Sequence, residues 1–136
     1  MGKHKPPEVL VVEDQSLTRM DAADAISDMG LGVHEAGDAD EALQAMEDYP
    51  DIGVLFTDIQ MPGQTDGLDL AEQVHADRPD VELIVTSGGI TLQDSDLPDN
   101  GTFLSKPYQT DRLVKIVKEK VANRSDDKDP DSGRAT

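Results

Sequence analysis

Short apolar runs alternate along the chain with segments in which apolar residues recur every three or four positions. The runs are rich in β-branched residues and end at turn signals, which is typical of strands buried on both faces of a parallel sheet. The central run ends at Asp58, and Met61-Pro62-Gly63 then turns the chain away. The pattern predicts five strands, at residues 9–12, 32–36, 52–57, 83–87 and 102–104.

Helix signals fill the segments between these runs. Ser16, Asp38 and Asp66 each precede an amphipathic stretch, and such residues cap helix N-termini by accepting backbone hydrogen bonds. The first helix should end before Gly30 and bury a stripe made of Leu17, Met20, Ala23 and Ile26. A last helix should begin near Asp111 and bury Leu113, Ile116, Val117 and Val121.

The alternation fails between residues 88 and 105, where a fourth helix would fit. Gly88 and Gly89 open this stretch, and Pro98 and Gly101 interrupt it. Leu92 and Leu97 alone form no helical stripe. We therefore expect a loop or a short stub there, so that the fourth helix is short or absent.

Strands that alternate with helices imply right-handed βαβ crossovers and a parallel sheet covered by helices on both faces. The predicted fold class is therefore α/β with a doubly wound parallel sheet. At 136 residues the chain has the length of one domain. We expect this domain at 8–122, after a flexible leader at 1–7 and before a disordered tail at 123–136 that has little apolar surface to bury.

Composition removes several classes of function. Twelve Lys and Arg against 29 Asp and Glu give a net charge of −17, which leaves no basic face for the phosphates of a nucleic acid. The chain has no cysteine, and this excludes disulfides and thiolate-bound metals. Its apolar runs are far shorter than the roughly 20 residues that span a bilayer, and no signal peptide is evident. We expect a cytoplasmic protein without a membrane or nucleic-acid partner.

Residues that can carry chemistry gather at the C-terminal ends of the expected strands. Glu13 and Asp14 follow the first strand, and Asp58 ends the third. These ends meet at one edge of a parallel sheet, so their side chains can converge. Three carboxylates in one site repel each other unless a cation lies among them, and hard oxygen ligands suit Mg²⁺. The same edge would receive two hydroxyl groups and an ammonium group, those of Thr86, Ser87 and Lys106.

A carboxylate nucleophile, Mg²⁺, a lysine and a hydroxyl group are the parts needed for phosphoryl transfer onto an aspartate. In these residues the chain resembles the receiver domain of two-component response regulators, over residues 8–122. The likeness rests on four motifs in order, each at a strand end: Glu13-Asp14, Asp58 in Asp-x-x-Met-Pro-Gly, Ser87-Gly88 and Lys106-Pro107. It implies a flavodoxin-like (βα)5 fold with strand order 2-1-3-4-5. Too few residues follow Val121 for an output domain, so we expect a single-domain, stand-alone regulator.

The resemblance also implies roles for individual residues. Asp58 would accept a phosphoryl group from a phosphohistidine, and Lys106, joined to Pro107 by a cis bond, would contact that group. Mg²⁺ would be bound by Asp14, by Asp58, by Glu13 through water and by the backbone carbonyl of Gln60. The switch hydroxyl would be Ser87, with Thr86 as its rival, and the switch aromatic residue would be Phe103.

The output remains open at this point. In one interpretation the chain is a switch that takes its phosphoryl group from a sensor histidine kinase or a histidine phosphotransfer protein and then docks on a protein target. In another it is a phosphate sink that drains a kinase by rapid hydrolysis, which Gln60 and Gly89 would favour. A third is a receiver-like scaffold that is never phosphorylated. A haloacid dehalogenase-type hydrolase is disfavoured, because it needs a second Asp at position 60. Beyond self-phosphorylation and self-dephosphorylation we expect no enzymatic activity.

Overall fold

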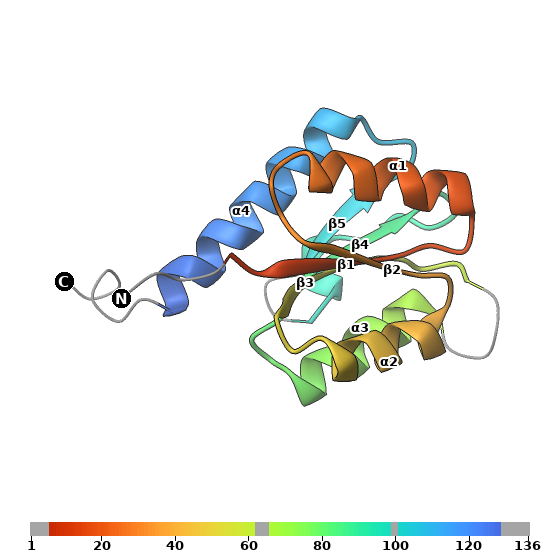
Figure 1. Cartoon of the computed structure of the whole chain (residues 1–136). Coiled ribbons are helices and arrows are strands. Elements are labelled where there is room, and N and C mark those ends of the chain that lie inside the picture. Colours follow the sequence, from red (N-terminus) through yellow and green to blue (C-terminus); the bar gives the residue numbers. More distant parts are fainter. Residues whose placement is uncertain (1–5, 62–65, 99–100, 129–136) are drawn as a thin grey trace.

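The computed structural model describes residues 6–61, 66–98 and 101–128, with side chains up to residue 124. The expected turn at Pro62-Gly63 and the outer parts of the leader and tail lie outside these residues. Strands and helices alternate along the chain (Figure 1). The elements are β1 (Glu8–Val12), α1 (Ser16–Ser27), β2 (Val33–Ala36), α2 (Ala39–Asp48), β3 (Ile52–Asp58), α3 (Gly67–Asp77), β4 (Glu82–Ser87), the 3₁₀ turn η1 (Asp94–Asp96), β5 (Thr102–Ser105) and α4 (Thr110–Lys128).

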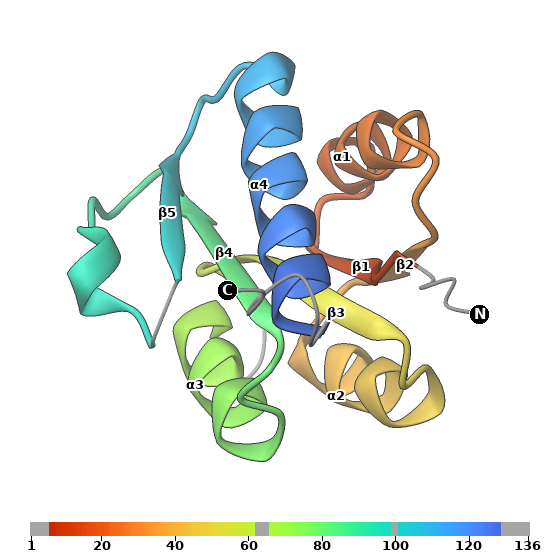
Figure 2. The same ribbon diagram turned by 90° about the vertical axis from the view of Figure 1, so that its left-hand side faces the viewer.

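The five strands form one parallel sheet in the order β2-β1-β3-β4-β5. This confirms the predicted flavodoxin-like, doubly wound fold. All residues of the central strand β3 are buried, which explains its continuous apolar pattern. The helices α1 and α4 cover one face of the sheet, and α2 and α3 cover the other (Figures 1 and 2).

Two apolar clusters fill the space between the sheet and its helices. Neighbouring residues of a strand point to opposite faces, so Val54 joins the cluster under α1 and α4 while Leu55 joins the one under α2 and α3. The clusters hold the strands in register, and their largest fully buried side chains include Leu10, Ile26, Leu70, Leu83, Ile84 and Leu113. The register fixes which residues reach the C-terminal edge of the sheet.

Two of the three predicted N-caps are confirmed. The side chains of Asp38 and Asp66 accept hydrogen bonds from the backbone N–H groups of Glu41 and Asp69, at 2.8 and 2.9 Å. The prediction for Ser16 is wrong by one residue, because Gln15 occupies the cap position of α1 and its side chain makes no capping bond. The N–H of Gln15 instead contacts the Glu13 carboxylate, a tertiary contact that the sequence pattern does not show.

The predicted buried stripe of α1 is also partly wrong. Leu17 and Met20 are 77% and 49% exposed, and the helix buries Ala22, Ala23 and Ile26. The buried side of α1 is thus formed by two alanines and Ile26, and it is rotated away from Leu17 and Met20.

The stretch between β4 and β5 lacks a full helix, as the sequence predicted. Among its described residues, helical structure is limited to the three-residue turn η1. Gln93 and Asp96 close this turn by reciprocal side-chain hydrogen bonds to each other's backbone N–H groups. Leu97 is buried against the core and ties the segment to the α2–α3 side of the sheet.

The predicted domain boundaries are too narrow at both ends. Helix α4 continues to Lys128 rather than stopping near residue 122, and Pro7 of the expected leader is buried. The extension is held by Lys120 and Arg124, which are both 6% exposed. Their partners lie on and before β4, where Lys120 pairs with Glu82 at 3.6 Å and Arg124 with Asp80 at 2.9 Å. The spacing of apolar residues does not indicate such contacts between polar side chains.

No helix among the described residues is long and apolar enough to cross a bilayer.

Candidate functional site

Three carboxylates meet at the C-terminal edge of the sheet. Glu13 and Asp14 follow β1, Asp58 ends β3, and the parallel pairing of Val12 with Thr57 places these strand ends side by side. One carboxylate oxygen from each acidic residue lies within 4.8 Å of the other two. Glu13 and Asp58 are buried, whereas Asp14 is exposed. The sequence predicted this grouping from the strand ends alone.

Lys106 reaches the same cluster from the end of β5. Its backbone N–H donates to the carbonyl of Ser87 at 3.0 Å, and its bond to Pro107 is cis, as the resemblance implied. The side-chain Nζ donates to Glu13 Oε1 at 2.9 Å and to Asp58 Oδ2 at 3.1 Å. One ammonium group therefore bridges the two buried carboxylates.

The cluster carries an excess of negative charge. Burial raises the pKa of Glu13 above its ordinary value of 4.5, although hydrogen bonds from Lys106 and from the N–H of Gln15 oppose this shift. Burial alone would lower the pKa of Lys106, but its hydrogen bonds to Glu13 and Asp58 outweigh burial and raise its pKa above 10.5. Three carboxylates face one ammonium group here, so a cation placed between them would relieve the remaining repulsion.

Gln60 lies beside the acidic cluster, two residues after Asp58. Its backbone N–H is 3.3 Å from Asp58 Oδ1. Its side-chain amide lies over Gly89, where an added Cβ atom would stand 2.4 Å from Gln60 Nε2. The loops after β3 and β4 are therefore in contact next to the carboxylates.

The two candidate switch hydroxyls have different environments. The Thr86 hydroxyl donates to the carbonyl of Leu104 at 2.5 Å and so is bound to the neighbouring strand. The Ser87 oxygen accepts the N–H groups of Gly89 and Ile90, both at 3.2 Å. Both residues are buried. The Ser87 hydroxyl can therefore still donate a hydrogen bond to another acceptor, whereas the Thr86 hydroxyl already donates to Leu104.

Phe103 is half-buried on β5 and packs against the α2–α3 cluster. Its backbone N–H donates to Asp94 Oδ1 of η1 at 2.8 Å. It also lines a cavity of about 380 Å³ beside Tyr108 and Arg112. The aromatic ring therefore lies where the segment that replaces the fourth helix meets the end of β5.

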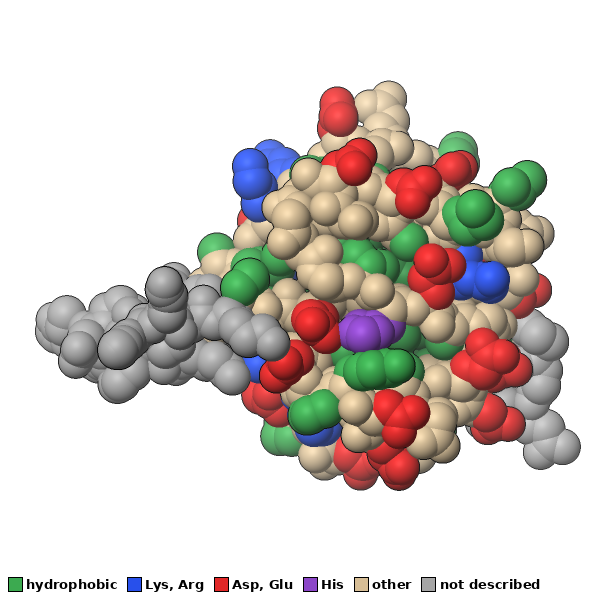
Figure 3. Space-filling model, viewed as in Figure 1, with side chains coloured by type: hydrophobic (Ala, Val, Ile, Leu, Met, Phe, Trp, Pro, Cys, Tyr) green, Lys and Arg blue, Asp and Glu red, His purple; other side chains and the backbone are tan. Residues whose placement is uncertain are grey.

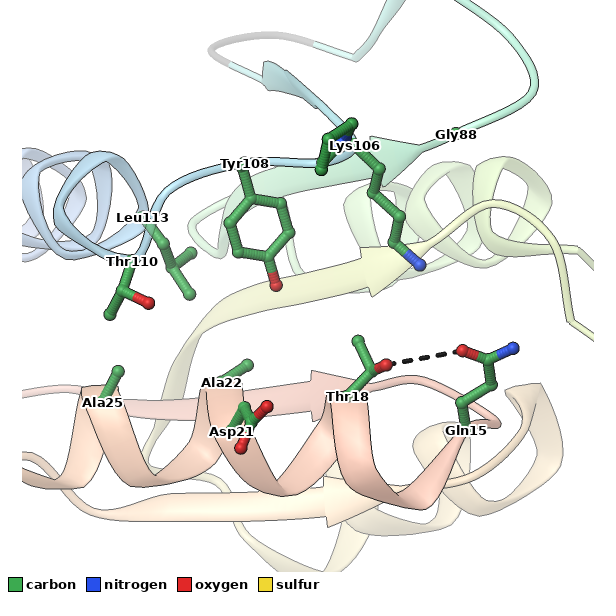
Figure 4. Close-up of a pocket in the computed structure, with 11 residues that line it drawn as sticks. Gln15, Thr18, Asp21, Ala22, Ala25, Gly88, Lys106, Tyr108, Thr110 and Leu113 are labelled. Atoms are coloured by element: carbon green, nitrogen blue, oxygen red, sulfur yellow. Dashed lines mark hydrogen bonds between the residues drawn. The ribbon is translucent and has the colours of Figure 1, made fainter.

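A second cavity of about 540 Å³ opens between α1 and the loop that follows β5 (Figure 4). Lys106 and Tyr108 extend into it from one side, and Gln15 and Thr18 of α1 lie opposite, joined by a 3.4 Å hydrogen bond. Burial raises the pKa of Tyr108 above 10.0. Motif residues such as Lys106 and Pro107 line one wall of this cavity, but no pattern in the sequence indicated that α1 would form the opposite wall.

Comparisons with known proteins identify the family of the chain. A family model described as the response regulator receiver domain matches residues 9–118. The chain is 30% identical over 112 residues to the response regulator receiver protein CpdR of Brucella abortus, covering 80% of this chain and 92% of CpdR. It is 34% identical over 117 residues to the sensor kinase CckA of the same species, covering 82% of this chain and 12% of CckA.

Solved structures show the same likeness. A response regulator receiver protein from Pseudomonas putida superposes with a TM-score of 0.76 at 28% identity, covering 86% of this chain and 99% of that one. The chain spans less than a fifth of the length of three long relatives, CckA among them. The family model covers most of the sequence, and the fold matches that of a solved receiver protein: the chain belongs to the family of response regulator receiver domains.

Proposed function

We propose that Asp58 accepts a phosphoryl group from a phosphohistidine of a sensor histidine kinase or a histidine phosphotransfer protein. The observation that carries the proposal is the meeting of three carboxylates and one ammonium group at the sheet edge, with Lys106 Nζ 3.1 Å from Asp58. The group is transferred onto and off the chain itself, so no separate substrate is turned over. Membership of the receiver family supports this assignment.

The donor set fits Mg²⁺. Asp14, Asp58 and the backbone carbonyl of Gln60 would hold the ion, with Glu13 acting through water, as the resemblance to the family implies. When bound, Mg²⁺ would neutralise charge on the phosphoryl oxygens. Burial raises the pKa of Glu13, the nearby charge of Asp58 adds a smaller effect in the same direction, and a bound cation would oppose both.

The transfer is an in-line displacement at phosphorus. An oxygen of Asp58 forms the new O–P bond while the P–N bond of the donor breaks, and the departing imidazole keeps the electron pair. The N–H of Gln60 contacts Asp58 Oδ1 and limits rotation of the carboxylate. Lys106 stays protonated because its pKa is raised, and its charge stabilises the transferred oxygens.

The signal is a change in packing around the new group. A phosphoryl group brings about −1.5 to −2 charges and new acceptor oxygens, to which the free proton of Ser87 and the ammonium of Lys106 would turn. The loop after β4 would follow Ser87, and Phe103 would move with it. To invert a 1:99 population of two such states requires about 5.5 kcal/mol of differential interaction.

The phosphodonor would dock on α1. Leu17 and Met20 are exposed on this helix. The cavity beside Tyr108 lies between α1 and Lys106. A histidine carried on a donor helix could reach Asp58 while that helix covers these apolar side chains. Acidic side chains are spread widely over the face shown in Figure 3. They would favour a donor protein that has basic residues around its histidine, and they would disfavour binding of a nucleic acid.

A phosphate sink is the second candidate function. The observation that favours it is the position of the Gln60 amide over Gly89, next to Asp58. There the amide could orient the water that hydrolyses the acyl phosphate, and the glycine leaves that water access. The lifetime of the phosphorylated form separates the two functions, because a sink must decay rapidly. In both we place the protein in the cytoplasm, with the kinase domain of its partner.

Intact mass spectrometry after incubation with acetyl phosphate or phosphoramidate tests the proposal. The wild type in Mg²⁺ should gain one phosphoryl adduct, and Asp58→Asn should gain none. EDTA should abolish the adduct on the wild type. An equal adduct on Asp58→Asn, or none on a folded wild type that also binds no Mg²⁺, would reject the proposed function and favour an inert scaffold.

A further inference from the structure

The acidic pair is held in place by an arginine on α1 that no motif singled out. Arg19 Nη1 donates to the backbone carbonyl of Glu13 at 2.8 Å, and Arg19 Nε donates to Glu35 Oε1 of β2 at 3.1 Å. A guanidinium group is planar, so two such bonds made through different nitrogens fix its orientation.

The backbone N–H and the backbone carbonyl of Glu13 are both hydrogen-bonded. Its N–H donates to the carbonyl of Ala36 at 3.0 Å, and its carbonyl accepts Arg19. Arg19 and Glu13 bind neighbouring residues at the end of β2: Arg19 binds Glu35, and the N–H of Glu13 binds Ala36. Arg19 therefore ties the turn after β1 to the end of the edge strand.

Asp14 depends on this arrangement more than its neighbours do. Glu13 and Asp58 have hydrogen-bond partners for their carboxylates, whereas within the described part of the chain the Asp14 carboxylate makes no hydrogen bond or ion pair. Its direction is set by the backbone between Glu13 and Gln15. The Glu13 carbonyl belongs to the peptide group that joins Glu13 to Asp14, and that is the group that Arg19 holds.

We infer that Arg19 is a positioning residue for the cation site: it fixes the Glu13–Asp14 peptide so that Asp14 points at the metal. The inference rests on the proposed function, because it takes the acidic cluster to be the Mg²⁺ site. Loss of a partner that orients a ligand lowers metal affinity by about 10- to 100-fold. The expected change here is at the lower end, because Arg19 acts on a ligand's backbone.

The test is the Mg²⁺ dissociation constant, measured by calorimetry or NMR titration without any phosphodonor. Arg19→Ala should weaken Mg²⁺ binding about 10-fold. Glu35→Ala is the matched control, since it removes the ion pair and leaves the bond to the Glu13 carbonyl; it should change the constant less than 3-fold. Arg19→Lys, which keeps a charged donor group without the planar fork, should lie between them.

A second measurement separates positioning from stability. If Arg19 positions the metal ligands, Arg19→Ala should raise the half-saturating Mg²⁺ concentration for phosphorylation and leave the rate at saturating Mg²⁺ close to that of the wild type. Unchanged Mg²⁺ affinity in a folded Arg19→Ala protein would overturn the inference, as would an equal loss in Glu35→Ala. A wild type that binds no Mg²⁺ would instead reject the proposed function, and the inference with it.

Discussion

Lys106 determines how the acidic cluster behaves without a metal. Its ammonium group bridges Glu13 and Asp58 at 2.9 and 3.1 Å and so occupies part of the space where a cation's charge would act. The same group serves two purposes in the proposed mechanism: it balances the buried carboxylates beforehand and contacts the phosphoryl group afterwards.

Replacing Lys106 should therefore separate metal binding from phosphoryl transfer. In Lys106→Met the competing positive charge is gone, so Mg²⁺ affinity should rise about threefold. Phosphorylation by acetyl phosphate should slow by about 100-fold, because a preorganised charge is missing from the transition state. Titration calorimetry and intact mass measure the two effects, with Lys106→Arg as the charge-preserving control. Weaker Mg²⁺ binding in Lys106→Met would contradict this account.

The two candidate switch hydroxyls should respond differently to removal. Thr86→Val loses a buried bond to Leu104 and should lower the free energy of unfolding by about 1–2 kcal/mol. Ser87→Ala should cost less stability, yet it should abolish the NMR shift changes that phosphorylation causes around Phe103. If the phosphorylated Ser87→Ala protein still shows those changes and Thr86→Val does not, Thr86 is the switch residue.

The grouping of side chains at the strand ends could be predicted because parallel strands place their C-termini at one edge of the sheet, whatever the packing beneath. Glu13, Asp14, Asp58 and Lys106 meet there for that reason. Arg19 could not be predicted in the same way. Its role depends on a contact with a backbone carbonyl, and no residue type or spacing in the sequence indicates which carbonyl a helical arginine will reach.

At the scale of elements, the sequence correctly predicted that no full helix forms between β4 and β5, but it did not predict where α4 ends. Gly88, Gly89 and Pro98 disfavour a helix by local backbone preference, which can be read directly. The end of α4 is held by Lys120 and Arg124, polar residues that become buried against β4 and the loop before it. Polar residues near a chain end predict exposure, and here tertiary ion pairs override that expectation.

The anchor of α4 should have a pH signature. Burial alone would raise the pKa of Asp80, but hydrogen bonds from Arg124 and Arg78 outweigh it and lower the pKa below 3.8. A carboxylate with a lowered folded-state pKa stabilises the fold above its unfolded pKa, and loses that effect as pH falls through the folded value. Urea unfolding should therefore show wild type more stable than Asp80→Asn at pH 7.

The difference between these two proteins should shrink as pH falls below 3.8. A gap that stays constant down to the acid limit of folding would show that Asp80 does not titrate in this way. Added salt at pH 7 should narrow the gap, because Asp80 is about half exposed and its ion pairs are partly screened.

For the whole molecule, the open matter is whether the domain stores its phosphoryl group or disposes of it. The fourth helix is reduced to η1, so a face built from a complete fourth helix is missing from the described structure. A switch would need another output face, whereas a sink would need none. Whether the domain is a switch or a sink, its net charge of −17 favours partner proteins with a basic binding surface.

Two neighbouring glycines allow a matched test of the sink. A Cβ atom at Gly89 would stand 2.4 Å from Gln60 Nε2 and displace that amide, whereas one at Gly88 would lie 3.5 Å from Lys106 Cβ, at ordinary contact distance. If Gln60 orients the attacking water, Gly89→Ala should lengthen the phosphoryl lifetime by about 10-fold. Gly88→Ala should leave it near the wild-type value. Equal lifetimes in all three proteins, followed by intact mass, would remove the support for a sink.

The most direct test of the central claim is to locate the phosphoryl group. After phosphorylation in Mg²⁺, borohydride reduces an acyl phosphate on aspartate to homoserine, and peptide mass mapping then identifies the modified position. We predict homoserine at position 58 alone, dependent on both phosphodonor and Mg²⁺. Modification at another carboxylate such as Glu13 or Asp14, or at none in a folded protein that binds Mg²⁺, would contradict the assignment of Asp58 as the phosphoacceptor.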